Sequence, residues 1–385
     1  MNPDMEIAGF EQGPIRPPSE AGSLLVRATR NCPWNRCAFC HTYRQERFSL
    51  RPVEEIKVDI LRMAEIAEEI RSLSRRCGEG GRIGEGTLRR IFSGEGNGGC
   101  RSIAAWLDGG GESVFLQDAD ALIMKTEDLA EVVAFIRKTF PSVSRITTYA
   151  RAKTASRKTV EELKRLREAG LSRIHVGMES GCDPLLRFVC KGVTAADQVE
   201  GGRKIREAGI SLCEYVMPGL GGKDWSREHA LATADALNQI DPDHIRLRTL
   251  QAVPGTELAQ KIKGGEFQPL DDEAILREIR LLIENLEGIG SEIVSDHILN
   301  LLEELEGKLP GDRERLLGVI DRFFSLPPEE RMIFRLGRRM GVYRRLDDLS
   351  DGVWRTRFQD ILDGYRHKEP LELERDLARI RSRYI

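Results

Sequence analysis

The sequence lacks the features of a membrane protein or a secreted protein. No apolar run approaches the length needed to cross a bilayer, and the first twenty residues contain no basic segment followed by an apolar one. The sequence also lacks an excess of positive charge, since 59 Lys and Arg stand against 62 Asp and Glu, a formal net charge of −3. A nucleic-acid partner is therefore not expected. Because membrane and secretion signals are lacking, the cytoplasm is the expected compartment.

Cysteine is unevenly distributed. No cysteine follows Cys213, and three of the eight cysteines lie in the stretch RATRNCPWNRCAFCHTYRQ (27–45). In a reducing compartment, clustered cysteines more often bind metal or do chemistry than form disulfides. The five cysteines outside this stretch lack the spacing of metal ligands, and we interpret them as ordinary thiols.

Short β-branched runs alternate with long amphipathic segments. The predicted strands are 24–28, 113–117, 145–149, 173–177, 211–217 and 244–250. The predicted helices between them are 52–73, 126–140, 156–170, 194–209 and 226–240. This alternation predicts an α/β fold with a parallel sheet, in which functional residues gather at the carboxyl ends of the strands. The cysteine cluster follows the first strand and belongs to that edge.

Composition divides the chain into three parts. We expect an N-terminal extension over 1–22, an α/β body over 23–265 and an all-helical C-terminal extension over 266–385. A glycine-rich and charged insertion, 77–111, interrupts the body. We interpret this insertion as a surface loop with one short helix over 100–107 or, alternatively, as a lid over the site or a segment that docks a partner.

The three clustered thiolates are Cys32, Cys37 and Cys40. They are one ligand short of a closed tetrahedral zinc site, whereas three cysteines suit a 4Fe-4S cluster with one open iron. A structural zinc completed by His41 or a distant cysteine is the alternative at this point.

The ordered series of motifs over about residues 22–260 resembles the radical SAM superfamily, in particular the branch of oxygen-independent coproporphyrinogen oxidases and methylthiotransferases. The resemblance implies a partial six-stranded (βα)6 barrel. It implies that the three cysteines bind a 4Fe-4S cluster, that S-adenosylmethionine chelates the open iron, and that Phe39 lies beside the adenine. The sequence CPWNRC departs from the family pattern, because four residues rather than three separate its two cysteines.

The same resemblance assigns further cofactor contacts. Asp118 and Asp120 stand where the family receives the methionyl ammonium, and turn-forming aspartates are the alternative reading. Glu179 would bind the ribose hydroxyls, and Lys191 would meet the methionyl carboxylate unless it is a solvated lysine. Further predicted contacts are Arg151, to cofactor or substrate, and the glycine turn at Gly219, to adenosine.

The function implied is an oxygen-sensitive radical enzyme. A reductant such as flavodoxin or ferredoxin would reduce the cluster, S-adenosylmethionine would be cleaved, and the resulting radical would abstract hydrogen from a small-molecule substrate. The sequence identifies neither that substrate nor any catalytic side chain of the protein itself. The alternatives are a non-catalytic carrier of haem or another cofactor, and an enzyme that modifies RNA or protein.

Two features of the C-terminal third are open to a functional reading. The basic segment FRLGRRMGVYRR (334–345) is an RNA or anion site or, more simply, a solvated helix face. Asp296 and His297 lie side by side in SDHILN, where they would reach substrate if this part folds over the barrel mouth. A satisfied core histidine is the alternative.

Overall fold

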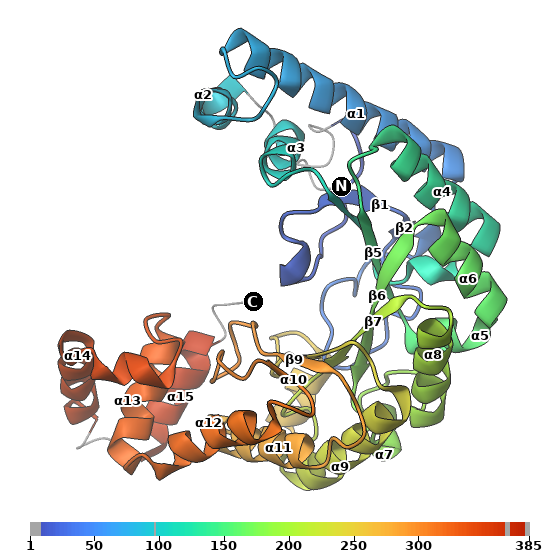
Figure 1. Ribbon diagram of the computed structural model, residues 1–385. Coiled ribbons are helices and arrows are strands. Elements are labelled where there is room, and N and C mark those ends of the chain that lie inside the picture. The colour runs from blue at the N-terminus through green and yellow to red at the C-terminus, as the bar shows by residue number, and fades with distance from the viewer. Residues whose placement is uncertain (1–8, 96–97, 366–369, 382–385) are drawn as a thin grey trace. The chain divides into compact units, whose positions relative to one another are not determined.

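The computed structural model describes residues 9–95, 98–365 and 370–381 (Figure 1). The chain forms two compact units. Unit 1 comprises Met1–Asn35, Thr42–Val176 and Lys204–Leu212. Unit 2 comprises Arg36–His41, Gly177–Arg203 and Cys213–Ile385. The chain therefore passes between the units several times, and the cysteine loop is divided between them.

Unit 1 is built on parallel strands. Their order is β1 (Leu24–Arg27), β4 (Ser113–Gln117), β5 (Arg145–Ala150) and β6 (Leu171–Glu179), the last of which ends in unit 2. Val114 and Leu116 are fully buried, as is typical of a strand covered by helices. Between these strands the chain forms α1 (Val53–Arg76), α4 (Thr126–Thr139), α5 (Ala152–Arg157) and α6 (Val160–Ala169). Helix α4 packs against α1 and α6, as Figure 1 shows.

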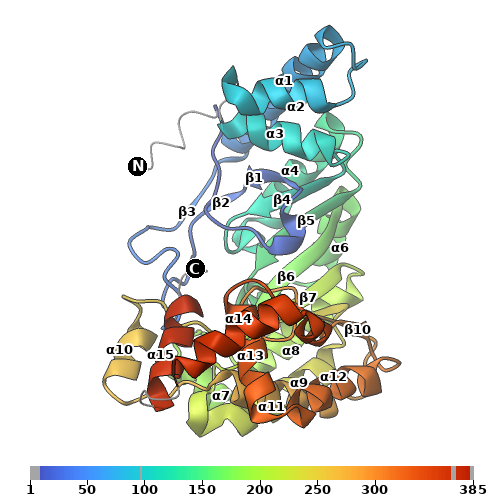
Figure 2. The same ribbon diagram turned by 90° about the vertical axis from the view of Figure 1, so that its left-hand side faces the viewer.

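The insertion predicted at 77–111 is more ordered than a surface loop. It contains α2 (Glu85–Arg90) and α3 (Gly98–Asp108), which pack against α1 (Figure 2). The buried side chains of Ile103, Ala104 and Trp106 anchor α3, and the indole N–H of Trp106 donates to the carbonyl oxygen of Ser113 at 2.9 Å. This part of the insertion therefore belongs to the core of unit 1.

Unit 2 continues the strand pattern. Strands β7 (Ser211–Val216), which begins in unit 1, β8 (His244–Leu247) and β9 (Glu292–Val294) are parallel, and β10 (Gly307–Lys308) is antiparallel to β9. Its helices before and after β8 are α7 (Asp183–Phe188), α8 (Ala195–Glu207), which ends in unit 1, α9 (Gly222–Ile240), α10 (Glu257–Lys263) and α11 (Asp272–Glu284). The last helices are α12 (Arg313–Ser325), α13 (Pro328–Arg339), α14 (Gly352–Asp363) and α15 (Pro370–Arg381). Helix α13 packs against α14 and α15, which Figure 2 shows together.

The predicted α/β class with a mostly parallel sheet is confirmed, and all six predicted strands are present as β1 and β4–β8. The prediction that residues 266–385 are all-helical is wrong at one place. Residues 291–307 have apolar residues at helical spacing, yet they form β9, β10 and the connection between them. The extension is therefore not all-helical. Buried polar groups hold this connection: Ser295 Oγ donates to the carbonyl oxygen of Leu302 at 2.8 Å, and Asn300 Nδ2 donates to that of Leu247 at 2.9 Å.

The division into three parts at residues 22 and 265 stays a prediction. In the described part of the chain, no helix is long and apolar enough to cross a membrane.

Candidate functional site

The tip of the cysteine loop is anchored in unit 2. The backbone N–H of Ala38 donates to the carbonyl oxygen of Val189 at 2.8 Å, and the carbonyl oxygen of Ala38 accepts from the N–H of Leu258 at 2.9 Å. Ala38 itself is fully buried in an apolar cluster. Its neighbours Cys37 and Cys40 are joined by a turn hydrogen bond of 3.1 Å, and both thiols are partly exposed. The fold thus holds the turn rigidly while it leaves its two thiols accessible.

Three residues predicted to contact cofactor come together beside this turn. Lys191 Nζ lies 2.9 Å from Glu179 Oε1, and the same ammonium lies 5.8 Å from the centre of the Phe39 ring. A Cβ atom at Gly177 would lie 2.6 Å from Glu179 Oε1 and 3.1 Å from Lys191 Nζ. A side chain at this position would therefore displace the Glu179 carboxylate and the Lys191 ammonium, so this arrangement of the pair depends on glycine.

A further acidic residue, Glu214 of β7, interacts electrostatically with Lys191 and Glu179. It is fully buried, and neither carboxylate oxygen has a hydrogen-bond partner in the part of the chain that the structure describes. Burial raises its pKa well above the usual value, with Lys191 acting against the shift and Glu179 adding to it. Sequence analysis missed this residue, although an acidic residue inside the apolar run SLCEYVM is itself a signal.

In unit 1, Asp118 holds the start of the cysteine loop. Its Oδ2 accepts from Arg27 Nε at 2.9 Å, from Arg27 Nη2 at 2.7 Å and from the backbone N–H of Asn31 at 3.0 Å. Its Oδ1 accepts from the hydroxyl of Tyr43 at 3.0 Å. Most of the acceptor capacity of this carboxylate is therefore already used within the protein.

Asp120 differs from Asp118 because one of its oxygens is unused. Its Oδ2 accepts from the hydroxyl of Thr154 at 2.5 Å, while Oδ1 is buried with no hydrogen-bond partner among the described residues. Burial raises the pKa of Asp120 to about 6, although Thr154, Arg151 and Lys158 act in the opposite direction. An orphaned buried carboxylate oxygen fits an ammonium group as its ligand.

The first part of the cysteine loop contacts Arg151. Its guanidinium lies 5.1 Å from the centre of the Trp34 ring, a cation–π distance. Cys32 Sγ accepts from the N–H of Asn35 at 3.4 Å, and Asn31 and Asn35 both have positive φ. Asparagine tolerates this backbone region better than most residues, so the longer CPWNRC spacing is accommodated as a turn.

Whether the three thiols share one cluster stays a prediction. Cys32 belongs to unit 1, whereas Cys37 and Cys40 belong to unit 2. Among the residues described, no group of three His, Cys, Asp or Glu is arranged to hold a metal ion. The ligand assignment thus rests on spacing and on the anchored, partly exposed turn.

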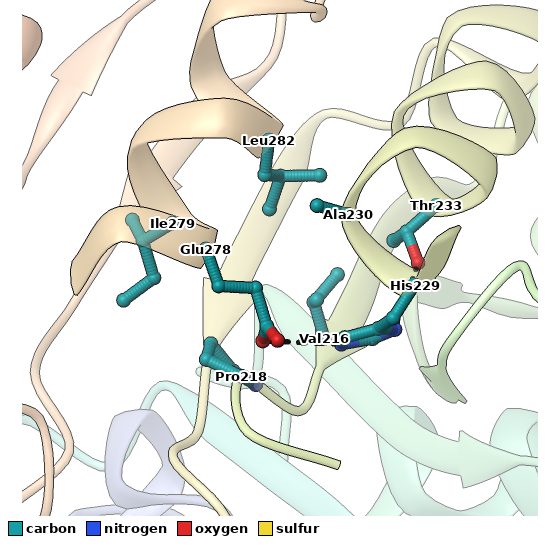
Figure 3. Close-up of a pocket in the computed structure, with 8 residues that line it drawn as sticks. All are labelled: Val216, Pro218, His229, Ala230, Thr233, Glu278, Ile279 and Leu282. Atoms are coloured by element: carbon teal, nitrogen blue, oxygen red, sulfur yellow. Dashed lines mark hydrogen bonds and ion pairs between the residues drawn. The ribbon is translucent and has the colours of Figure 1, made fainter. Parts of the chain in front are cut away.

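The glycine turn after β7 is supported by buried polar groups of α9 and α11. Gly219 has a φ of +87°, and its N–H donates to Glu278 Oε1 at 2.6 Å. Glu278 also lies 3.6 Å from His229 Nε2, and both line a small cavity with Val216 (Figure 3). These contacts explain how the turn is fixed in place.

The basic segment 334–345 does not form an exposed patch. Arg335, Arg338 and Arg339 of α13 are all buried. Arg339 Nη2 lies 2.5 Å from Asp272 Oδ1, Arg335 Nη2 lies 2.7 Å from Glu374 Oε2, and Arg338 Nη1 lies 2.9 Å from Glu303 Oε2. The reading as a solvated helix face is therefore wrong for these three arginines, because they hold unit 2 together internally.

Comparison with known proteins connects this geometry to a family. Residues 100–234 match the model of the Radical SAM superfamily. This range begins after the cysteine loop and contains the six predicted contacts from Asp118 to Gly219. Two curated relatives match with distant identity. A tRNA uridine(34) acetyltransferase of Methanocaldococcus jannaschii is 23% identical over 120 residues, which is 31% of this chain and 22% of that protein. A biotin synthase of Clostridium botulinum is 24% identical over 160 residues, which is 41% of this chain and 49% of that protein.

A solved structure of a radical S-adenosylmethionine enzyme is similar to this chain at low sequence identity. The radical S-adenosylmethionine methyltransferase TsrM of Kitasatospora setae, with cobalamin and a 4Fe-4S cluster bound, is 14% identical. It superposes with a TM-score of 0.43 over 90% of this chain and 61% of that chain, a likeness that supports no further conclusion.

This chain spans about half the length, or less, of the two curated relatives described above. Taken with the α/β fold, the family match confirms the resemblance seen in the sequence. Over residues 100–234 the chain matches the radical SAM superfamily, whose members are enzymes that use S-adenosylmethionine and a 4Fe-4S cluster.

Proposed function

We propose that this protein is a radical enzyme that acts on a small molecule. The observation that carries the proposal is the convergence of Phe39, Glu179 and Lys191 beside the turn of Cys37 and Cys40, all within unit 2. When bound, a reduced 4Fe-4S cluster and S-adenosylmethionine supply reductive cleavage of the sulfonium and a radical that removes hydrogen from substrate. A flavodoxin- or ferredoxin-like reductant provides the electron.

The side chains have distinct binding roles in this proposal. The thiolates of Cys32, Cys37 and Cys40 hold the cluster. Glu179 accepts from the ribose hydroxyls, and the Lys191 ammonium holds that carboxylate in place while it attracts the methionyl carboxylate. The Phe39 ring packs on the adenine.

The remaining predicted contacts differ in whether their polar atoms already have partners within the protein. The orphaned oxygen of Asp120 supports it as the acceptor for the methionyl ammonium, whereas Asp118 positions the loop through Arg27 and Tyr43. The Gly219 turn lets backbone approach the adenosine. Arg151 supports the loop through Trp34.

Anaerobic incubation with reductant and S-adenosylmethionine tests the proposal. The wild-type protein should contain iron and form 5′-deoxyadenosine, and Cys37→Ala should lose both properties. Cys77→Ala is the matched control, because Cys77 is also a partly exposed thiol but lies at the end of α1. Zinc in place of iron, or equal activity in both variants, would overturn the proposal. Intact S-adenosylmethionine together with tight haem binding would support the carrier alternative instead.

An RNA-modifying enzyme is the second candidate. The name of the M. jannaschii relative, a tRNA uridine(34) acetyltransferase, favours it. The burial of Arg335, Arg338 and Arg339 weighs against the RNA surface suggested by segment 334–345. Binding of tRNA by the purified protein at physiological salt would favour this candidate.

A further inference from the structure

A group of polar side chains lies at the carboxyl ends of β8 and β9, apart from the residues assigned to the cofactor. Strands β8 and β9 are parallel, and Arg246 of β8 lies opposite Val294 of β9. Arg248 and Asp296 each follow two residues later, so they leave neighbouring strands at the same edge, and His297 comes next. We call Arg246, Arg248, Asp296 and His297 the strand-end cluster. All four belong to unit 2.

Arg246 and Asp296 form an ion pair that is incompletely satisfied. Arg246 Nη1 lies 2.6 Å from Asp296 Oδ2, and the guanidinium lies 6.0 Å from the centre of the Tyr215 ring. Arg246 is only 9% exposed. Within the described residues, Arg246 Nε and Asp296 Oδ1 are nevertheless buried without hydrogen-bond partners. Asp296 is 31% exposed, so the pair can be reached from outside although these two atoms are covered. A buried donor and a buried acceptor without partners are unfavourable in the protein alone, and a ligand that carries both functions would satisfy them.

His297 adds a neutral ring to this cluster. Its Nδ1 is another buried atom that has no partner in the described part of the chain. Burial, together with the positive charges of Arg248, Arg338 and Arg339, lowers the pKa of His297 to about 3. At neutral pH the ring is therefore uncharged, so it offers hydrogen bonding without adding charge.

Arg248 is the cation available to a ligand. Arg338 and Arg339 are occupied by Glu303 and Asp272. In contrast, Arg248 is exposed, and its side chain has no hydrogen bond or ion pair among the residues that the structure describes. An unpaired guanidinium beside a neutral histidine attracts an anion, because a carboxylate or phosphate matches its planar donors.

We propose that the strand-end cluster binds the substrate, and that this substrate is a small molecule with an anionic group and a nearby hydroxyl or amino group. Arg248 holds the carboxylate or phosphate. Asp296 Oδ1 accepts from the hydroxyl or amino group, and Arg246 Nε and His297 contribute further hydrogen bonds. The inference rests on the proposed function, since it assigns a substrate class to the same radical enzyme. A small ligand is favoured over RNA because Arg246 is almost fully buried.

Two probes distinguish the two kinds of anion: malate carries carboxylates with a hydroxyl, and glycerol 3-phosphate carries a phosphate with hydroxyls. Their binding to the anaerobically reconstituted protein is measured by ligand-detected NMR, with S-adenosylmethionine present and absent. We expect one of them to bind with a dissociation constant on the order of 1 mM. Arg248→Gln should weaken this binding about tenfold, as expected for the loss of a charge-assisted hydrogen bond. Asp296→Asn should weaken it less.

Arg227→Gln is the matched control, because Arg227 is an exposed arginine of α9 outside the cluster. It should leave the binding of both probes unchanged. The affinity for S-adenosylmethionine should be the same in the wild type, in both cluster variants and in this control.

Four outcomes would overturn the inference. The first is that neither probe binds, and the second is that Arg248→Gln binds the probe as tightly as Arg227→Gln does. The third is that Arg248→Gln loses affinity for S-adenosylmethionine, which would assign Arg248 to the cofactor. The fourth is that Arg248→Gln weakens only the binding of tRNA. The probe measurement needs no cleavage of S-adenosylmethionine, and iron content and cleavage are recorded separately. Failure of the substrate site can thus be told apart from failure of the proposed function.

Discussion

The Lys191 ammonium contacts the Glu179 carboxylate at 2.9 Å, and both side chains are nearly buried, with 13% and 12% of their surface exposed. The ion pair joins the end of β6 to the segment after α7. Because partly buried charges are screened less by water than surface charges, this pair holds the Glu179 carboxylate in a fixed position.

Replacement of Glu179 should weaken cofactor binding without loss of iron. Glu179→Gln removes the charge that holds Lys191 and the stronger acceptor for ribose hydroxyls, so S-adenosylmethionine should bind about tenfold more weakly. Isothermal titration measures the affinity, and iron content is assayed on the same samples. The exposed Glu228→Gln of α9 is the control. Loss of iron in Glu179→Gln would mean that this residue has a structural role.

Cofactor affinity should depend on pH through Asp120. Its pKa is raised to about 6, so the carboxylate is protonated below that pH and ionised above it. Only the ionised form attracts the methionyl ammonium strongly, and the affinity for S-adenosylmethionine should therefore rise as the pH increases from 5 to 7. Asp120→Asn should bind more weakly at pH 7 and lose this rise. An unchanged pH profile in the variant would assign the titration to another group.

The buried Glu214 should lower stability at neutral pH. Its pKa is higher in the folded chain than in the unfolded chain, so the folded state binds more protons between these two values. The free energy of unfolding must fall as the pH rises through that window. Glu214→Met removes the unpartnered carboxyl group and should increase the free energy of unfolding by about 1–3 kcal/mol at pH 7. Denaturant titrations at pH 5 and pH 7 test both statements, and a destabilised variant would contradict them.

Asp272 should have the opposite effect. This fully buried carboxylate contacts Arg339 and Arg381, and Arg335 lies 3.3 Å away. Burial would raise its pKa, but the three arginines together hold the pKa well below the usual range. Its contribution to stability is therefore present above the unfolded pKa, and it declines as the pH falls below that value.

Removing this charge leaves three cations without their shared partner. We expect Asp272→Asn to decrease the free energy of unfolding at pH 7 by about 3–5 kcal/mol. Thermal unfolding followed by circular dichroism measures the loss. Asp271→Asn is the control, since Asp271 is exposed and caps α11 through a single hydrogen bond to the N–H of Ala274. Equal losses in the two variants would argue against a central role for Asp272.

The sequence by itself determined most of the elements and the resemblance to the radical SAM superfamily. Strands of four to nine residues with buried faces and helices with an apolar stripe carry periodicities that are local, and β1, β4–β8 and α9 therefore lie where the patterns predict. The spacing of Cys32, Cys37 and Cys40 is likewise a local property. Periodicity reports which side of an element is buried but not what covers it. For that reason residues 291–307, with their apolar residues at helical spacing, were mistaken for a helix.

Only the tertiary structure decided which polar side chains have hydrogen-bond or ion-pair partners within the protein and which are left to bind a ligand. Asp118 and Asp120 are two residues apart and look alike in sequence. Arg27 and Tyr43 nevertheless donate hydrogen bonds to both oxygens of Asp118, whereas Oδ1 of Asp120 has no partner among the described residues. The arginines of α13 are likewise predicted to be either a solvated helix face or an RNA or anion site, although distant carboxylates hold them inside unit 2. A hydrogen bond or ion pair forms between groups that packing brings within about 3 Å, and packing joins residues far apart in the chain.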